Sequence, residues 1–440
     1  MKRILLLLTV LGALNLGAQH AYDSSILTDG SKSISLLSGF PNILESDLIF
    51  YGFIHGAETP QHVEAQLLIE LLKKGVKYYA PEVSPSGAYF LNKFLATGNE
   101  DYLHYVLQTY AAPQDASKQW IEKYNKVYTF NNTLPDSDRL SIIGTDREDS
   151  DKLKISHLAH LLPDEETGIS IIDSLKLYLA PEETLHFTNG KHLFKLAFKH
   201  GCSYKDILYD QKSQHYFAKR FTAYYDEHTE KVLGYFKHNR EEVMGLMTSS
   251  KTDRETTITD RFTQKIIPLL EEGQKVYSNY GYAHVLQESF NGKTYLAGRL
   301  KRAYPNLSIY SILSQLADCS VLESAKVCED RKIKRYGKTI TLAKVCGVSN
   351  STEWDGDTTK ERIRGLDEIQ QVTPASGISL IPVANLSQEQ SASRYFIDYE
   401  DGKNTDDIKL DLTKTTSDYF QGLIFIQGSK ANTPYDLPSE

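Results

Sequence analysis

Short apolar runs and longer amphipathic stretches alternate along this chain. Residues 48–54 form an apolar run with the length of a buried strand. In residues 64–74 apolar side chains recur at helical spacing, and Gly75 follows as the residue type that most often ends a helix. Residues 77–83 form a second strand-length run. A strand, a crossover helix and a second strand make the unit from which parallel sheets are built.

The rest of the chain extends this α/β pattern. Further strands are predicted at residues 140–144, 275–281, 307–312 and 422–427, with mostly helical intervals between them. The middle, at residues 153–270, is mainly helical, and residues 214–247 carry a long stripe of apolar side chains that is typical of the core face of a helix. We therefore predict a mostly parallel central sheet flanked by helices, with a largely helical middle segment and a strand-containing C-terminal segment.

The first residues have the pattern of a targeting signal. Lys2 and Arg3 precede an apolar run at residues 4–16, which is short for a membrane span and typical of a secretory signal peptide. Cleavage is predicted after the small residue Ala18, although Leu16 stands where a small residue is usual. We therefore predict that residues 1–18 are a signal peptide and that the protein is exported, to the periplasm or the extracellular space.

The chain after the signal peptide divides into two predicted segments that differ in amino-acid composition. Residues 19–330 are predicted to form one α/β domain. Residues 331–411 are rich in Gly, Ser, Thr, Asn and Asp, with only short alternating runs such as 339–345 and 378–383, which indicates an irregular insert or an extension of the sheet. Residues 331–440 are therefore predicted to be an irregular C-terminal segment. Its last strand, residues 422–427, is apolar enough to rejoin the main sheet. No segment after the signal peptide resembles a membrane span.

Composition narrows the class of protein. Of the 440 residues, 40% are hydrophobic and 24% charged, which is enough apolar material for a large core. Lys and Arg number 49 against 57 Asp and Glu, a net charge of −8, and no long basic run occurs. Because binding to nucleic acid needs a clustered basic surface, the sequence argues against that partner. The cysteines are sparse for a disulfide scaffold, and their spacing leaves the pairing open; they are Cys202, Cys319, Cys328 and Cys346.

Histidines and carboxylates follow several of the predicted strands. His55 comes after the first strand with Glu58 three residues on, Glu82 ends the second strand, and Asp146 and His284 follow later ones. In open α/β sheets, ligands bind at the carboxyl ends of the strands. Imidazole and carboxylate groups together can activate water by general acid–base catalysis, or they can hold a metal ion. The residues alone do not choose between these uses.

Several motifs together resemble the erythromycin-esterase-like proteins. This family lies in a wider superfamily with haem-uptake lipoproteins and Tiki-type metalloproteases. The matching segments occur in order between residues 48 and 313, and they are YGFIHG at 51–56, GVKYYAPE at 75–82, AYFLNKFLATG at 88–98, IGTDRE at 143–148, REEVM at 240–244 and GYAHV at 281–285. Their order and spacing, rather than any one motif, carry the resemblance.

The resemblance implies an α/β sheet with a site at the strand ends. His55 would be the water-activating base or a metal ligand, Glu82 its acidic partner and His284 the second histidine of the family. Arg240 matches a family arginine on the long helix, where a guanidinium can bind a carboxylate or another anion through two hydrogen bonds. A solvated helix charge is the alternative interpretation of Arg240.

One position departs from the family pattern. Family members usually have an acidic residue directly after the glycine of the first motif, where this chain has Phe53. A phenylalanine can neither accept a proton nor bind a metal, so catalysis is expected to be lost or altered unless Glu58 or Glu64 takes over. Loss of such a carboxylate costs a rate factor of roughly 10² to 10⁴.

Three functions follow from these residues. The first is an exported hydrolase that activates water at a histidine and carboxylate site against an ester, lactone or similar bond. The second is a catalytically degenerate pocket that binds a small molecule or a haem-like ligand, which Phe53 and the many tyrosines favour. The third is a metal-dependent peptidase, which would need His55, His284 and a carboxylate around one ion. The expected partner is a small-molecule substrate or ligand, and the sequence leaves cofactor and metal open.

Overall fold

The chain divides into two compact units. A computed structural model describes residues 20–23, 27, 35–107, 117–179, 211–248, 253–290, 292–322, 327–335, 338–345, 351–354, 357–358, 361–363, 371, 373–383, 399–400 and 414–433. Unit 1 comprises the described residues of Met1–Pro81, Ala112–Ser141 and Thr263–Glu440, and unit 2 those of Glu82–Ala111 and Ile142–Phe262. Residue 330 is therefore not a boundary between the units. The predicted signal peptide, Cys202 and Cys346 lie outside the described residues.

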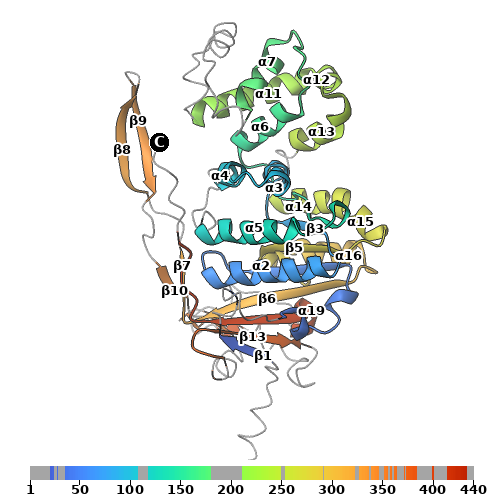
Figure 1. Cartoon of the computed structure of the whole chain (residues 1–440), viewed down its shortest axis with the longest axis vertical. Helices are drawn as coiled ribbons and strands as arrows, with labels where there is room; N and C mark the ends of the chain where they lie inside the picture. The colour runs from blue at the N-terminus through green and yellow to red at the C-terminus, as the bar shows by residue number, and fades with distance from the viewer. Residues whose placement is uncertain are drawn as a thin grey trace, which may run out of the picture. The chain divides into compact units, whose positions relative to one another are not determined.

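An eight-stranded sheet organises unit 1 (Figure 1). Its strands in spatial order are β1 (His20–Asp23), β13 (Gly377–Pro382), β15 (Gly422–Gln427), β6 (Ile309–Ala317), β2 (Leu48–Phe53), β5 (Val276–Gly281), β3 (Tyr78–Pro81) and β4 (Ser141–Ile142). From β15 to β3 neighbouring strands run parallel, whereas β13 is antiparallel to both β15 and β1. The predicted class, a mostly parallel sheet flanked by helices, is confirmed.

All six predicted strands lie in this sheet, but one extends further than expected. Strand β6 continues to Ala317, through the polar residues Ser314 and Gln315. Both polar side chains are buried, because β6 lies between β2 and β15 and both faces of the sheet are covered. A strand buried on both faces is not marked by alternation, so a polar residue gives a false end to the pattern.

Helices cover both faces of the sheet. Helix α2 (Glu58–Lys73) packs beside α5 (Lys118–Asn131) and begins six residues before the predicted stripe, because its first turn is also buried. Gly75, with a φ of 84°, follows its end as expected. Tyr51 of β2 faces the α2 side, where burial raises the pKa of its phenol and the Glu64 charge raises it further. Gly52 points the opposite way, toward the short helix η8 (Tyr282–Val285).

Shorter elements complete unit 1. The remaining helical turns are η2 (Leu37–Gly39), η3 (Ile43–Glu45), η4 (Asp136–Asp138), α15 (Ile267–Glu271), α16 (Leu296–Ala303) and α19 (Thr416–Tyr419). Three small sheets pair β7 (Cys319–Leu322) with β10 (Ser351–Trp354), β8 (Val327–Arg335) with β9 (Lys338–Val345), and β12 (Glu361–Ile363) with both β11 (Asp357–Thr358) and β14 (Tyr399–Glu400). Cys319 is a free, buried thiol.

The described part of unit 2 is mainly helical. Its elements are α3 (Pro85–Thr97), α4 (Asp101–Leu107), α6 (Asp151–Leu161), α7 (Ser170–Asp173), η5 (Ser174–Tyr178), α11 (Gln211–Glu227), α12 (Thr229–Phe236), η6 (Lys237–Asn239), α13 (Arg240–Thr248) and α14 (Arg254–Arg261), followed by η7 (Phe262–Ile266) at the boundary. The apolar stripe at 214–247 belongs to three helices rather than one, with a break at Lys237, whose φ is 42°. As predicted, the stripe is core: Phe221, Val232 and Val243 are buried in one cluster.

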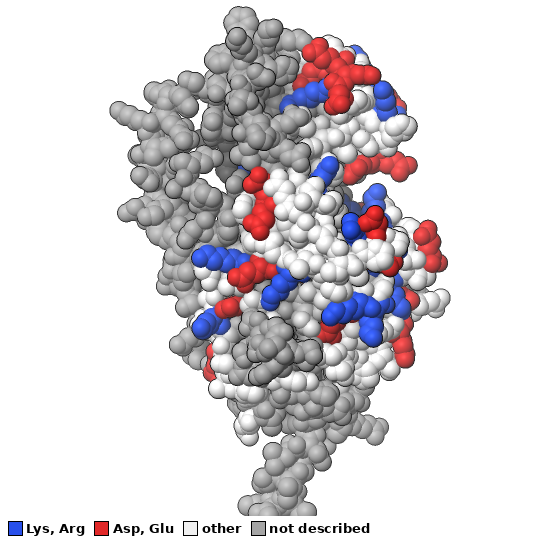
Figure 2. All heavy atoms as spheres, viewed as in Figure 1, with Lys and Arg blue, Asp and Glu red and all other residues white. Residues whose placement is uncertain are grey.

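Two features of the described residues bear on binding to membranes and to charged partners. No helix among the described residues combines the length and the apolarity needed to cross a membrane. On the face drawn in Figure 2, basic and acidic side chains of the described residues are interspersed.

Candidate active site

His55 lies in a tight turn after the central strand β2. The turn depends on Gly56, whose φ is 91° and whose carbonyl accepts hydrogen bonds from the backbone N–H groups of Leu322, at 2.9 Å, and Asn432, at 2.7 Å. A Cβ at Gly56 would lie 2.5 Å from the Leu322 carbonyl oxygen, so only glycine fits. The His55 ring is half-buried and lies 4.7 Å from the Phe53 ring, between centroids. The backbone around this imidazole is therefore firmly held.

His284 lies after the neighbouring strand β5, in the short helix η8. A Cβ at Gly52 would lie 2.3 Å from Val285 Cγ2, so the missing side chain lets η8 approach β2 closely. His284 is 9% exposed, and its ring lies 5.5 Å from that of Tyr280 and 5.4 Å from that of Tyr295. This histidine is thus enclosed by aromatic rings rather than presented on an open loop.

The two histidine-bearing turns leave adjacent strands at one edge of the sheet. Strands β2 and β5 pair in parallel, with Phe53 opposite Gly281. His55 follows Phe53 by two residues, and His284 follows Gly281 by three. This is the strand-end placement that the sequence predicted for both residues.

Glu58 begins helix α2 and pairs with a histidine on the same helix. Its Oε1 lies 3.4 Å from Nε2 of His62, and the side chains are 32% and 7% exposed respectively. Burial lowers the pKa of His62 and Lys126 lowers it further, whereas Glu58 and Glu122 oppose the shift. His62 therefore favours its neutral form, and Glu58 is held one helical turn from it.

In unit 2, one arginine joins the two predicted carboxylates. The Arg254 guanidinium donates side-on to Asp146, from Nε to Oδ1 at 3.0 Å and from Nη2 to Oδ2 at 2.7 Å, and Nη2 also donates to Oε1 of Glu82. Glu82 and Asp146 are 16% and 12% exposed, and Arg254 is 36% exposed. Burial alone would lower the pKa of Arg254, but the two carboxylates raise it well above its ordinary value. The cluster carries one positive and two negative charges.

The backbone that presents Asp146 is also tightly constrained. The N–H groups of Thr145 and Asp146 both donate to the carbonyl of Val83, at 3.1 and 3.0 Å. Arg261, which is 7% exposed, donates to the carbonyl oxygen of Asp146. A Cβ at Gly144 would lie 2.3 Å from the carbonyl oxygen of Ser84, so this strand end needs a glycine. The segments after β3 and β4 are thereby joined.

The sequence pattern singles out Arg240 but not Arg254. The structure shows Arg240 at the start of α13, half-exposed, donating to both carboxylate oxygens of Glu230 at 2.7 and 2.8 Å. Arg254 begins α14, directly after the N-cap residue Asp253. No local pattern distinguishes the two arginines, because both stand in the first turn of an amphipathic helix. Only the folded chain brings one of them to Glu82.

Glu64, one of the two expected substitutes for the acidic residue absent at Phe53, lies inside unit 1. It is fully buried, and its Oε2 lies 2.9 Å from Nζ of Lys123, which is 4% exposed. The Tyr79 hydroxyl donates to Oε1 of Glu64, and burial followed by the Glu64 charge raises the Tyr79 pKa well above its ordinary value. The carboxylate of Glu64 is therefore engaged in a buried ion pair between α2 and α5.

Binding of a metal ion is the other use that the sequence leaves open for these residues. Within the described residues, no group of three or more His, Cys, Asp and Glu side chains is arranged to hold a metal ion.

The geometry defines an α/β protein with histidines and an arginine–carboxylate cluster near strand ends. No family model matches the sequence, and no curated protein matches it. Among solved structures, a mutant of the erythromycin esterase EreC in its open conformation aligns with a TM-score of 0.54 at 10% identity, over 94% of this chain and 99% of that chain. A protein from Bacillus cereus aligns with a TM-score of 0.53 at 12% identity, over 97% and 99%. A succinoglycan biosynthesis protein aligns with a TM-score of 0.51 at 12% identity, over 96% and 98%. At such identities the likeness shows the fold alone, which is that of these three structures.

Proposed function

We propose that this protein is a hydrolase in which His55 activates water against an ester, lactone or similar bond. The observation that carries the proposal is the half-buried imidazole held by the Gly56 turn at the carboxyl end of a central parallel strand. A neutral imidazole in that position can take a proton from water as the bond is attacked. The fold shared with an erythromycin esterase supports this reaction class.

The other predicted residues have supporting roles in this proposal. His284, after the adjacent strand, is the second histidine available for proton transfer or for binding a substrate oxygen. In unit 2, Arg254 fixes the orientation of Glu82 and Asp146, so both of these carboxylates have defined positions within that unit. Glu58 acts through its contact with His62 and is a positioning residue.

The test is hydrolysis of a panel of esters and lactones by the wild type and His55→Ala, with metal content measured on the same samples. We expect turnover in the wild type and a decrease of roughly 10²- to 10⁴-fold in His55→Ala, because a general base is lost. His228→Ala is the matched control, since His228 is 39% exposed on another part of the chain, and it should retain wild-type turnover. Equal turnover in wild type and His55→Ala would contradict the role of His55.

A second function is favoured by Phe53. Its ring lies 4.7 Å from the His55 ring between centroids, at a tilt of 58°, and it stacks on the Tyr51 ring at 6.0 Å. Phe53 stands where the family pattern has an acidic residue, and an aromatic side chain beside a histidine suits a planar ligand better than proton transfer. The alternative is therefore a non-catalytic pocket for a small molecule or a haem-like ligand.

Titration with haemin distinguishes the two functions. A ligand-binding pocket predicts a saturable Soret shift in the wild type that is lost in His55→Ala, without turnover of any ester by either protein. Turnover that disappears in His55→Ala, with no saturable shift, would instead leave the hydrolase as the function.

Export is part of the same proposal. The signal-peptide pattern of residues 1–18 supports it, and the mature N-terminus would then be Gln19. Mass spectrometry of the protein recovered from the periplasm or medium should find a chain that begins at Gln19. Recovery of the full-length chain from the cytoplasm alone would contradict export.

A further inference from the structure

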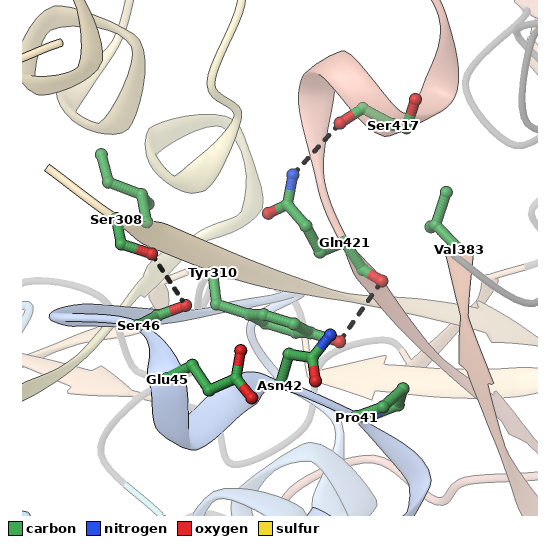
Figure 3. A pocket seen from close by; sticks show the side chains of 10 residues that line it. Pro41, Asn42, Glu45, Ser46, Ser308, Tyr310, Val383, Ser417 and Gln421 are labelled. Atoms are coloured by element: carbon green, nitrogen blue, oxygen red, sulfur yellow. Dashed lines mark hydrogen bonds between the residues drawn. The ribbon is translucent and has the colours of Figure 1, made fainter. Parts of the chain in front are cut away.

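A cavity lies at the other edge of the sheet in unit 1, away from the histidines. It has a volume of about 470 Å³ and is formed where β2, β6 and β15 begin, whereas His55 lies beyond the end of β2. Its polar lining comes from three separate segments (Figure 3), namely Asn42, Glu45, Ser46, Ser308, Tyr310, Ser417 and Gln421. Sites for small molecules commonly have volumes of about 300–1,000 Å³. The size therefore suits a small molecule.

The wall of this cavity is held by the sheet. The Tyr310 ring packs edge-on against Phe40 at 6.4 Å between centroids, and its hydroxyl donates to the carbonyl oxygen of Gln421 at 3.5 Å. The Gln421 side chain accepts from the backbone N–H of Ser311 at 2.9 Å and from Gln287 at 2.7 Å. Burial raises the pKa of Tyr310, so the phenol stays neutral. These contacts give a preformed wall with one aromatic ring.

Two polar side chains at the edge of the cavity have no bonding partner within the described residues. Within the described residues, the side chains of Asn42 and Glu45 make no hydrogen bond or ion pair. Asn42 has a φ of 65°, a left-handed conformation that non-glycine residues rarely adopt, and it caps η3 without a side-chain hydrogen bond. An amide offers donors and an acceptor, and a carboxylate offers acceptors. Both groups are thus available to a ligand in the cavity.

The charged and polar side chains that line the cavity indicate which chemical class of ligand it can bind. Of the lining side chains, Glu45 is the charged one, and hydroxyls and amides make up the rest of the polar surface. An anionic ligand would meet repulsion from Glu45 and no lining cation. We propose that this cavity binds a neutral polyhydroxylated ring, a saccharide unit, with its hydroxyls bonded to Asn42 and Glu45 and its apolar edge against Tyr310.

Calorimetric titration of the full chain with neutral saccharides tests the proposal. The probes are methyl α-D-glucoside, methyl α-D-mannoside, maltose and cellobiose, with spermidine and citrate as charged comparisons. We expect saturable binding of at least one saccharide. Asn42→Gly should weaken it about tenfold, since glycine accepts the left-handed backbone and only the amide is lost. Glu272→Gln, at an exposed carboxylate elsewhere in unit 1, is the matched control and should bind as the wild type does.

Glu45→Gln separates the ligand classes. A hydroxyl can still bond to the glutamine amide, so saccharide binding should fall only a few-fold, whereas binding of a cation should be abolished. Binding of spermidine alone, absence of saccharide binding across the panel, or saccharide binding unchanged by Asn42→Gly would each overturn the proposal. Ester hydrolysis by Asn42→Gly should equal that of the wild type, so this site and the proposed hydrolase can fail independently.

Discussion

The ion pair between Glu64 and Lys123 shows how strongly a single residue can depend on its partner. Both side chains are almost completely buried, and the Tyr79 hydroxyl donates to the same carboxylate. Removing one charge from a buried pair leaves the other without compensation inside the protein. The pair is 59 residues apart in sequence, so neither residue is marked as buried by its neighbours.

We predict that Lys123→Met lowers the free energy of unfolding by about 3–5 kcal/mol, because Glu64 is left as an unpaired buried charge. Urea denaturation followed by circular dichroism measures the change. Lys118→Met is the matched control: Lys118 is exposed on the same helix, and its replacement should change stability by no more than about 0.5 kcal/mol. Equal effects of the two substitutions would contradict the buried pair.

Arg254 provides a second prediction at the same scale. Arg254→Met removes the side-on contact with Asp146 and the contact with Glu82, and it should cost about 1–2 kcal/mol because the cluster is partly exposed. The control is Arg147→Met, since Arg147 pairs with Asp149 in an exposed contact and its loss should cost at most about 0.5 kcal/mol. Thermal denaturation of both variants makes the comparison. A cost for Arg147→Met that matches or exceeds that of Arg254→Met would argue against the cluster.

At the scale of elements, the contact between helices α2 and α5 should make stability depend on pH. His62 on α2 faces Lys126 and Glu122 of α5 and Glu58 of its own helix, and its pKa is lowered below 6.5 in the folded protein. The unfolded chain therefore binds more protons than the folded one just below pH 6.5. The folded protein therefore has its full stability with respect to His62 above pH 6.5. It loses that part of its stability as the pH falls from 6.5 toward the folded pKa of His62.

We predict that the melting temperature of the wild type falls more steeply between pH 7 and pH 5 than that of His62→Gln, which cannot titrate. Calorimetry at several pH values measures both slopes. Parallel slopes would show that His62 has the same pKa in the folded and unfolded chains. His238→Gln serves as a control, because His238 is exposed, and its slope should equal that of the wild type.

The joint between β4 and the start of α3 yields a prediction about backbone approach. Gly144→Ala would place a Cβ 2.3 Å from the Ser84 carbonyl oxygen and 2.5 Å from Pro85 Cα, so the backbone must move. We expect a loss of about 3 kcal/mol of stability. Gly234→Ala in α12 is the control, because nothing lies within 4 Å of the added Cβ, and helix propensity predicts a gain of about 0.5–1 kcal/mol. Similar effects at both glycines would contradict the close approach.

At the scale of the whole molecule, each unit has its own core. Leu233 is buried in the helical cluster of unit 2, and Leu316 is buried in strand β6 of unit 1. Truncation of a buried leucine to alanine costs about 2–5 kcal/mol. Separate cores predict two thermal transitions, of which Leu233→Ala lowers one and Leu316→Ala the other. Scanning calorimetry decides the point, and a single transition lowered equally by both variants would refute independent cores.

Much of the fold could be predicted from local pattern. The six strand-length apolar runs all became strands of the sheet, and Gly75 follows the end of α2 in a left-handed conformation. The predicted ends of two elements were wrong because burial extends them beyond the apolar pattern. Strand β6 continues through two buried polar residues, and helix α2 begins one to two turns earlier, in a buried first turn. The long stripe at 214–247 divided into three helices, because periodicity alone does not show where the chain turns.

The sequence by itself determined the α/β class and the strand-end positions of His55, Glu82, Asp146 and His284, since these depend on short-range periodicity and on the order of elements. Tertiary structure alone decided which charges meet. Arg254 contacts Asp146 and Glu82 from 108 and 172 residues away. The cavity beside Tyr310 likewise gathers segments that precede three different strands. Such contacts depend on how the strands are ordered in the sheet, and local hydrophobic pattern carries no record of that order.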